Sequence, residues 1–213
     1  MKGVRFGNYH SYYEWGLVLQ KKEIGAPEPK INQIEMEGGD GVLDLTEFFG
    51  EVKYKNRSLS FTFALPGTTQ SAFLALYSAV QGAIHGQKMK VILDDDPNNY
   101  YYGRVTINEW KSNKNIGEIV IEVDAEPYKY NMAETVVTKT VSGSATITLP
   151  NSRKRVVPTI TSSASMAFAF GGSTYSVGAG TFIIPDLELV EGNNSVVVTG
   201  NGTVSFRYRE GRL

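Results

Sequence analysis

Apolar and polar residues alternate along most of this chain, and that alternation is the feature that most constrains its fold. Leu59, Phe61 and Phe63 lie two positions apart, with Ser60 and Thr62 between them. Successive side chains of a strand point to opposite faces, so this pattern predicts a strand with one buried and one wetter face. Similar alternations recur at residues 119–124, 145–149, 166–170 and 204–208. The sequence therefore predicts a mainly β protein.

One segment between Pro66 and Gly86 departs from this period. Its apolar residues repeat at helical spacing: Phe73, Leu74, Tyr77, Val80, Ala83 and Ile84. Thr68 or Thr69 suits the N-cap and Gly86 suits the C′ position, which predicts a helix at about 68–85. Because the segment carries almost no basic residues, we expect its apolar stripe to pack on the sheet and not on a membrane.

The composition of the sequence changes after residues 127–130, which predicts two domains, 1–130 and 131–213. The first has long alternating strands and the helix, as in a β-sandwich or split-barrel-like domain. The second is built from evenly spaced short alternations, which predicts an antiparallel β-sandwich. Within it, Asn201-Gly202 is the strongest short turn signal, and we expect a hairpin turn there.

Composition excludes several kinds of chemistry. The chain has no cysteine, so disulfides and thiolate sites are ruled out, and its two histidines, His10 and His85, have no partner at ligand spacing. No nucleophile elbow or phosphate-binding loop is found, and we predict no enzyme activity and no cofactor. A net charge of −1 gives no general attraction to nucleic acid or to an anionic membrane. Without an apolar leader or an 18-residue apolar run, we expect synthesis in a cytoplasm and no membrane association.

The segment from Lys88 to Arg104 predicts a hairpin, with strands at 88–93 and 100–107 and three acids at its tip. Asp94, Asp96 and Asn98 match positions 1, 3 and 5 of a calcium loop. Positions 6 and 12 of such a loop require Gly and Glu, but here they hold Asn and Val. A solvated hairpin tip is therefore the preferred interpretation over a calcium site.

Aromatic residues gather in two places, at residues 9–15 and at residues 100–102. Tyr and Trp are enriched in protein–protein interfaces, and basic residues do not interleave with these clusters. We therefore rank a protein interface first, core packing second and nucleic-acid stacking last. This ranking favours a structural or binding protein.

Short motifs run along nearly the whole chain in a specific order. In the first domain they are Tyr9-His10-Ser11, Trp15-Gly16-Leu17, Pro27-Glu28-Pro29-Lys30, Gly38-Gly39-Asp40-Gly41, Leu43-Asp44-Leu45, Tyr54-Lys55-Asn56-Arg57, Leu93-Asp94-Asp95-Asp96-Pro97, Tyr102-Gly103-Arg104 and Glu126-Pro127-Tyr128. In the second they are Gly192-Asn193-Asn194, Gly200-Asn201-Gly202 and Glu210-Gly211-Arg212-Leu213. Together they resemble the distal tail proteins of siphophages, which have long non-contractile tails, and of related prophages.

This resemblance implies a virion protein of the phage tail tip. In that family the N-terminal β domain forms a hexameric ring that continues the tail-tube lumen and serves as a baseplate hub. The C-terminal domain is a galectin-like β-sandwich. Expected partners are the tail tube protein, the tail-associated fibre or lysin protein and, in some phages, receptor-binding proteins. DNA would pass through the lumen without sequence-specific binding.

The candidate interface or lumen residues are Tyr12, Trp15, Asp44, Arg57, Asp94, Asp95, Asp96, Tyr101 and Arg104. An acidic tip that faced the lumen would repel DNA phosphates, which we state as a hypothesis. The alternative function is a carbohydrate-binding module that recognises wall polysaccharide through the C-terminal sandwich. Against it, residues 131–213 contain no His and no Trp.

Overall fold

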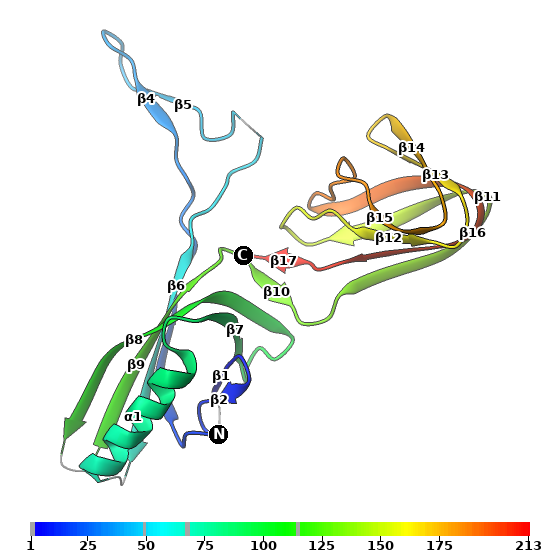
Figure 1. Ribbon diagram of the computed structural model, residues 1–213. Coiled ribbons are helices and arrows are strands. Elements are labelled where there is room, and N and C mark those ends of the chain that lie inside the picture. Colours follow the sequence, from blue (N-terminus) through cyan, green and yellow to red (C-terminus); the bar gives the residue numbers. More distant parts are fainter. Residues whose placement is uncertain (1–2, 49, 67–68, 114–115) are drawn as a thin grey trace. The chain divides into compact units, whose positions relative to one another are not determined.

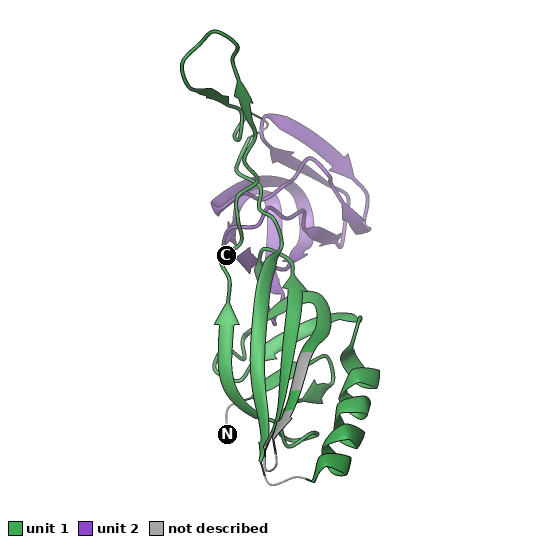
Figure 2. Cartoon of the chain, turned by 90° about the vertical axis from the view of Figure 1, so that its left-hand side faces the viewer, with its two compact units in different colours: residues 1–129, 213 green, residues 130–212 purple. Residues whose placement is uncertain are grey.

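The computed structural model describes residues 3–48, 50–66, 69–113 and 116–213. The chain divides into two compact units (Figure 2). Unit 1 comprises residues 1–129 with residue 213, and unit 2 comprises residues 130–212. The prediction of a mainly β chain is confirmed, because the described residues form many antiparallel strands and one helix (Figure 1).

Unit 1 is built on an antiparallel sheet with the strand order β2-β1-β7-β8-β9-β6-β3. The strands are β1 (Val4–Phe6), β2 (Tyr9–His10), β3 (Val18–Ile24), β6 (Arg57–Pro66), β7 (Lys88–Leu93), β8 (Asn99–Asn113) and β9 (Ile116–Ala125). The strands β7 and β8 form the hairpin that the sequence predicted, with Val91 opposite Tyr101. Each end of the order, β2 and β3, is an edge.

Strand β6 shows how the alternation makes the core of unit 1. Leu59, Phe61 and Phe63 are fully buried, while the residues between them lie on the wetter face. The Phe61 ring meets the Phe6 ring edge to face, with centroids 5.9 Å apart. Arg57 stands in the same phase as these apolar residues and is therefore also buried.

The helix α1 (Gln70–Ile84) lies against this sheet (Figure 1). Thr69 caps it, because its Oγ1 accepts a hydrogen bond of 3.3 Å from the backbone N–H of Ala72. Phe73, Val80 and Ile84 are its buried residues. A Cβ at position 117 would lie 2.3 Å from the Phe73 ring, so glycine at that position lets the helix approach the sheet closely.

A long excursion separates β3 from β6, and we call it the arm (residues 28–55, with residue 49 outside the described part). It carries the two-stranded hairpin of β4 (Gln33–Glu35) and β5 (Val42–Asp44), in which Ile34 is opposite Leu43. Figure 1 shows this hairpin extending away from the sheet of unit 1. The sequence analysis did not predict the arm.

Unit 2 consists of antiparallel strands in the order β14-β13-β16-β12-β15, with β11 paired to β16 along its whole length. The strands of this sheet are β11 (Thr135–Asn151), β12 (Thr159–Ser162), β13 (Met166–Phe170), β14 (Ser173–Val177), β15 (Gly180–Ile183) and β16 (Gly192–Tyr208). The short strands β10 (Lys129–Asn131) and β17 (Gly211–Arg212) pair with each other outside it. Its core includes Phe168 and Phe206, whose rings meet edge to face at 6.2 Å. The galectin-like description of this unit remains a prediction.

The predicted turn at Asn201-Gly202 is wrong, because β16 runs through these residues without reversing. One half of β16 pairs with β13 and the other half pairs with β12. Gly200 is the last residue paired with β13 and Gly202 lies just beyond it; their φ angles are +147° and +149°, and Met166 approaches both closely. The glycines therefore let a long strand pass a neighbouring segment and serve two partners, which a turn signal alone cannot reveal.

Candidate assembly surfaces

The acidic tip of the β7–β8 hairpin binds three separate segments of unit 1. Asp94 accepts hydrogen bonds from the backbone N–H of Gly3, at 2.7 Å, and from His10 Nε2, at 3.1 Å. Asp95 forms an ion pair with Lys22 of β3. These two side chains are about one third exposed.

Asp96 completes the pattern. Its carboxylate accepts from Lys129 Nζ at 2.9 Å and from Asn99 Nδ2 at 2.6 Å. Each acid of the tip thus has its own cation or donor, and the tip carries less unbalanced negative charge than the sequence suggested. Within the described residues, no three acidic or histidine side chains converge as metal ligands.

His10 is buried beside this tip, and its surroundings define its tautomer. The Nδ1 atom accepts backbone N–H groups from Tyr12, at 3.1 Å, and from Tyr13, at 3.3 Å. The proton of the neutral ring therefore lies on Nε2, which donates to Asp94. His10 links the N-terminal strands to the hairpin tip, so its part in the first recognised motif is structural.

The N-terminal aromatic cluster is divided between core and surface. Trp15 stacks on Tyr9 with centroids 5.5 Å apart and packs on the core of unit 1. Tyr12 is half-buried, and its ring meets that of Tyr13 edge to face. Tyr13 is 72% exposed and so offers the larger accessible surface, although Tyr12 and Trp15 were the predicted interface residues.

Arg57 and Tyr101 are brought together but lie in the interior of the chain. They are 8% and 6% exposed, and the guanidinium lies 5.4 Å from the centre of the tyrosine ring. Arg57 Nε donates to the carbonyl of Gly25 at 2.8 Å, and its NH1 donates to the carbonyl of Pro127 at 3.3 Å. Arg57 therefore holds the backbone at Gly25, which lies just before the arm.

Arg104 and Asp44 are exposed and lie apart from that pair. Arg104 NH1 donates to the carbonyl of Gly86 just after α1, at 2.6 Å. Asp44, in β5, accepts from the backbone N–H of Thr46 at 2.9 Å and from Gln33 Nε2 at 3.2 Å. Hydrogen bonding lowers the pKa of Asp44 below its ordinary value, and Thr46 contributes more to this shift than Gln33.

The arm presents an apolar surface that the sequence analysis missed. Its exposed apolar side chains are Ile31 (64%), Ile34 (49%), Met36 (50%), Val42 (50%), Leu43 (46%) and Phe48 (72%). Such a concentration on one extended segment is typical of a surface that another protein covers. The signal in the sequence was the pair of short apolar runs on either side of residues 38–41, where glycines allow a turn.

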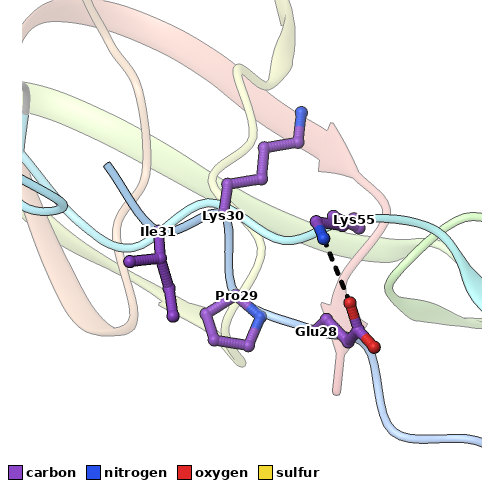
Figure 3. A pocket seen from close by; sticks show the side chains of 5 residues that line it. All are labelled: Glu28, Pro29, Lys30, Ile31 and Lys55. Carbon is purple, nitrogen blue, oxygen red and sulfur yellow. Dashed lines mark hydrogen bonds and ion pairs between the residues drawn. The ribbon is translucent and has the colours of Figure 1, made fainter. Parts of the chain in front are cut away.

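The root of the arm is held as a short antiparallel ladder. The backbone N–H of Lys30 donates to the carbonyl of Lys53 at 2.7 Å, and that of Lys55 donates to the carbonyl of Glu28 at 2.8 Å. An ion pair of 3.1 Å joins the Glu28 and Lys55 side chains beside a hollow of about 610 Å³ (Figure 3). The root is thus ordered by backbone pairing, while the apolar side chains farther along are left uncovered.

The chain thus has a mainly β first unit with one helix and an apolar arm, followed by an antiparallel β unit, and its fold is similar to that of a solved phage protein. That protein is the SPP1 Dit protein (gp 19.1). Its crystal structure matches all of this chain and all of its own, with a TM-score of 0.75 and 15% sequence identity. It is described as a paradigm of the hub adsorption apparatus in phages that infect Gram-positive bacteria.

No family model and no curated protein matches the sequence. The structural match to the SPP1 Dit protein confirms, at the level of the fold, the resemblance seen in the short motifs. Within the described residues, no helix is long and apolar enough to cross a membrane.

Proposed function

We propose that this chain is a structural subunit of a siphophage tail tip that forms a hexameric ring between the tail tube and the baseplate. The observation that carries this proposal is the full-length likeness to the SPP1 Dit protein. Both units match in one alignment, so the likeness covers the complete two-unit arrangement of folds and not one common β module. The role is structural, without catalysis or a cofactor, and its place is in the virion.

The arm supports ring formation by physical argument. A closed ring needs a heterologous interface, in which one surface of a subunit meets a different surface of the next. An extended segment with uncovered apolar side chains can supply one half of such an interface. Full burial of each large apolar side chain contributes about 1.5–3 kcal/mol, so several of them together favour association.

The proposed partners follow from the hub position. The tail tube protein would contact one side of the ring, and the tail-associated fibre or lysin protein would contact the other. Receptor-binding proteins would dock at the periphery in phages that carry them. The net charge of −1 fits a lumen that passes DNA without binding it in a sequence-specific way.

Light scattering coupled to size-exclusion chromatography over a concentration series tests the proposal. We expect a species near six times the subunit mass of 23.4 kDa, seen as a ring with a central hole in negative stain. If the isolated chain is monomeric, the same measurement is made after co-expression with the tail tube protein, because subunit affinity can be marginal alone. A monomer in both cases would refute the ring.

A pair of variants locates the interface. Ile34 and Leu43 face each other across the arm hairpin, and the double change to serine removes apolar surface from that hairpin. We expect this variant to lose the ring while it retains its fold by circular dichroism. The control is Val197→Ser in unit 2, which changes a side chain of comparable exposure, 38%, and should leave the ring intact.

A further inference from the structure

The sheet of unit 1 carries four exposed cations on one side of three neighbouring strands. Lys88 and Lys90 of β7 lie two positions apart, so they point to the same side. Lys88 is opposite Arg104 of β8, and Arg5 of β1 is opposite Ile92 of β7. Residues that are opposite each other share a side of the sheet, and Ile92 shares the side of the two lysines. We call Arg5, Lys88, Lys90 and Arg104 the basic face.

Two members of the basic face have carboxylates beside them. Lys88 Nζ lies 2.9 Å from the Glu126 carboxylate. Asp124 of β9 is opposite Arg104, but its carboxylate accepts a hydrogen bond of 3.1 Å from Asn56. The direct opposition of Lys88 and Arg104 is a like-charge pair, which destabilises a sheet unless a further anion covers it.

The other two members carry unbalanced charge. Arg5 and Lys90 form no ion pair with any carboxylate in the described part of the chain. The ammonium group of Lys90 lies 4.6 Å from the centre of the Tyr100 ring. This contact fixes the cation at the surface without neutralising it. The basic face therefore suits a partner that carries several carboxylates.

The arm carries the opposite charge. Its residues 31–48 include five acids and neither Lys nor Arg. All five acids are exposed, and within the described residues none of them forms an ion pair with a cation. We call them the arm acids: Glu35, Glu37, Asp40, Asp44 and Glu47. The arm hairpin extends away from the sheet (Figure 1), so the arm acids are presented to another molecule.

The two faces of the arm hairpin differ in chemistry. Ile34 and Leu43 are opposite each other and make one face apolar. The other face mixes charge with apolar surface, because Glu35 is opposite Val42, which is 50% exposed. Asp44 lies two positions from Val42 and shares this second face.

The basic face is mixed in the same way. Tyr102 is opposite Lys90 and Ile92 is opposite Arg5, and both apolar side chains are half-buried. Charged and apolar groups therefore alternate on both surfaces, with charges of opposite sign. Complementary charge of this kind fixes the register of an interface and disfavours other pairings.

We propose that the basic face of one copy of this chain binds the acid-bearing face of the arm hairpin of the next copy. This inference rests on the proposed ring, in which each copy gives its arm to one neighbour and receives the arm of the other. Such a contact is heterologous, as ring closure requires. It also leaves the apolar face of the hairpin, with Ile34 and Leu43, free to pack on a further surface in the assembly.

Two charge-reversed variants test the contact. The arm variant is Glu35→Lys with Glu37→Lys, and the face variant is Arg5→Glu with Lys90→Glu; none of the four side chains has an ion pair to lose. Each variant alone places like charges across every contact between copies. By sedimentation velocity, we expect the apparent dissociation constant of self-association to rise at least about tenfold for each.

An equimolar mixture of the two variants should restore association to within about threefold of the wild type. In the mixture, the reversed arm meets the reversed face and the unchanged arm meets the unchanged face, so the two variants alternate around a ring of even number. A contact between an arm and the basic face of its own chain would not be restored by mixing. The rescue therefore tests the contact between copies directly.

A single pair of variants and a salt series supply the controls. Lys90→Glu should weaken self-association, whereas Lys139→Glu, an exposed cation of β11 in unit 2, should change it by less than about twofold. Raising NaCl from about 0.1 M to about 1 M shortens the screening length from about 10 Å to about 3 Å and should weaken wild-type association at least about fivefold. Circular dichroism checks the fold of each variant, and the salt series needs no variant at all.

The outcomes separate this inference from the ring itself. A wild-type ring that persists in both variants, or that ignores salt, would overturn the contact and leave the ring standing. Rescue by mixing that yields only pairs or open chains would support the contact and refute the ring. No self-association of the wild type or the mixture at concentrations up to about 1 mM, alone and with the tail tube protein, would overturn both.

Discussion

Replacing Asp94 with alanine should destabilise unit 1 far more than the same change at Asp95, although both are acids of one hairpin tip. Asp94 accepts from His10 Nε2 and from the backbone N–H of Gly3, and His10 is 2% exposed. The variant leaves the buried Nε2–H of His10 without its acceptor, which costs about 1–3 kcal/mol, and it also removes the charged acceptor of Gly3. We expect a total loss of about 2–4 kcal/mol.

The matched change at Asp95 removes only its ion pair with Lys22, both of whose side chains are about one third exposed. Pairs of this kind contribute about 0–1 kcal/mol. If the acids of the tip served only as a patch of negative charge, the two variants would behave alike. The difference between them therefore separates the structural role of Asp94 from the electrostatic one.

Urea unfolding followed by tryptophan fluorescence measures this difference. Both tryptophans of the chain, at positions 15 and 110, lie in unit 1, so the signal reports this unit. With a slope of about 2 kcal/mol per molar urea, the Asp94→Ala midpoint should fall by about 1–2 M. The Asp95→Ala midpoint should fall by less than about 0.5 M. Equal midpoints for the two variants would refute the reasoning.

Three further changes probe unit 2. Asn194→Leu removes a buried amide that bonds four backbone groups near residues 149 and 190, and it should cost about 2–5 kcal/mol in thermal or urea unfolding. Burial and the nearby Glu210 raise the pKa of Tyr208 to about 12, so its contribution to stability is complete below pH 10 and declines between pH 10 and 12. Tyr208→Phe should flatten that decline relative to the wild type in unfolding measured across this range. Gly202→Ala places a Cβ 2.6 Å from Ser163 Oγ at a φ of +149°, and it should lower the melting temperature of the full chain; an unchanged melting temperature would contradict this close approach.

The fold carries two kinds of exposed surface with different chemistry. The arm of unit 1 is apolar and suits a protein partner, whereas the outer face of the unit 2 sheet is polar and carries Thr138, Thr161, Thr181 and Ser205. Neither surface overlaps the acidic tip or the Arg57–Tyr101 pair, whose side chains are occupied within the chain.

Local patterns in the sequence were sufficient for the elements of secondary structure. The alternation around Phe61 placed β6, and the helical spacing around Phe73 placed α1, because the period of apolar residues reports directly which face of an element is buried. The order of short motifs also indicated the fold that the comparison with the SPP1 Dit protein supports. The periodicity can be read within a few residues and the motif order along the whole chain, and neither requires knowing which distant residues are in contact.

Only the tertiary structure decided which side chains are available. Arg57 and Asp94 look like exposed charges in the sequence, yet distant segments supply their partners. Asn201-Gly202 has the residues of a turn, but β12 and β13 both need β16 as a neighbour, and that long-range pairing prevails over the local preference. A row of exposed hydroxyl side chains in unit 2 exists only through register, because four residues far apart in sequence become neighbours when four strands pair: Thr138, Ser205, Thr161 and Thr181. A sequence determines its local periods, whereas pairing between distant strands determines which residues meet and which remain exposed.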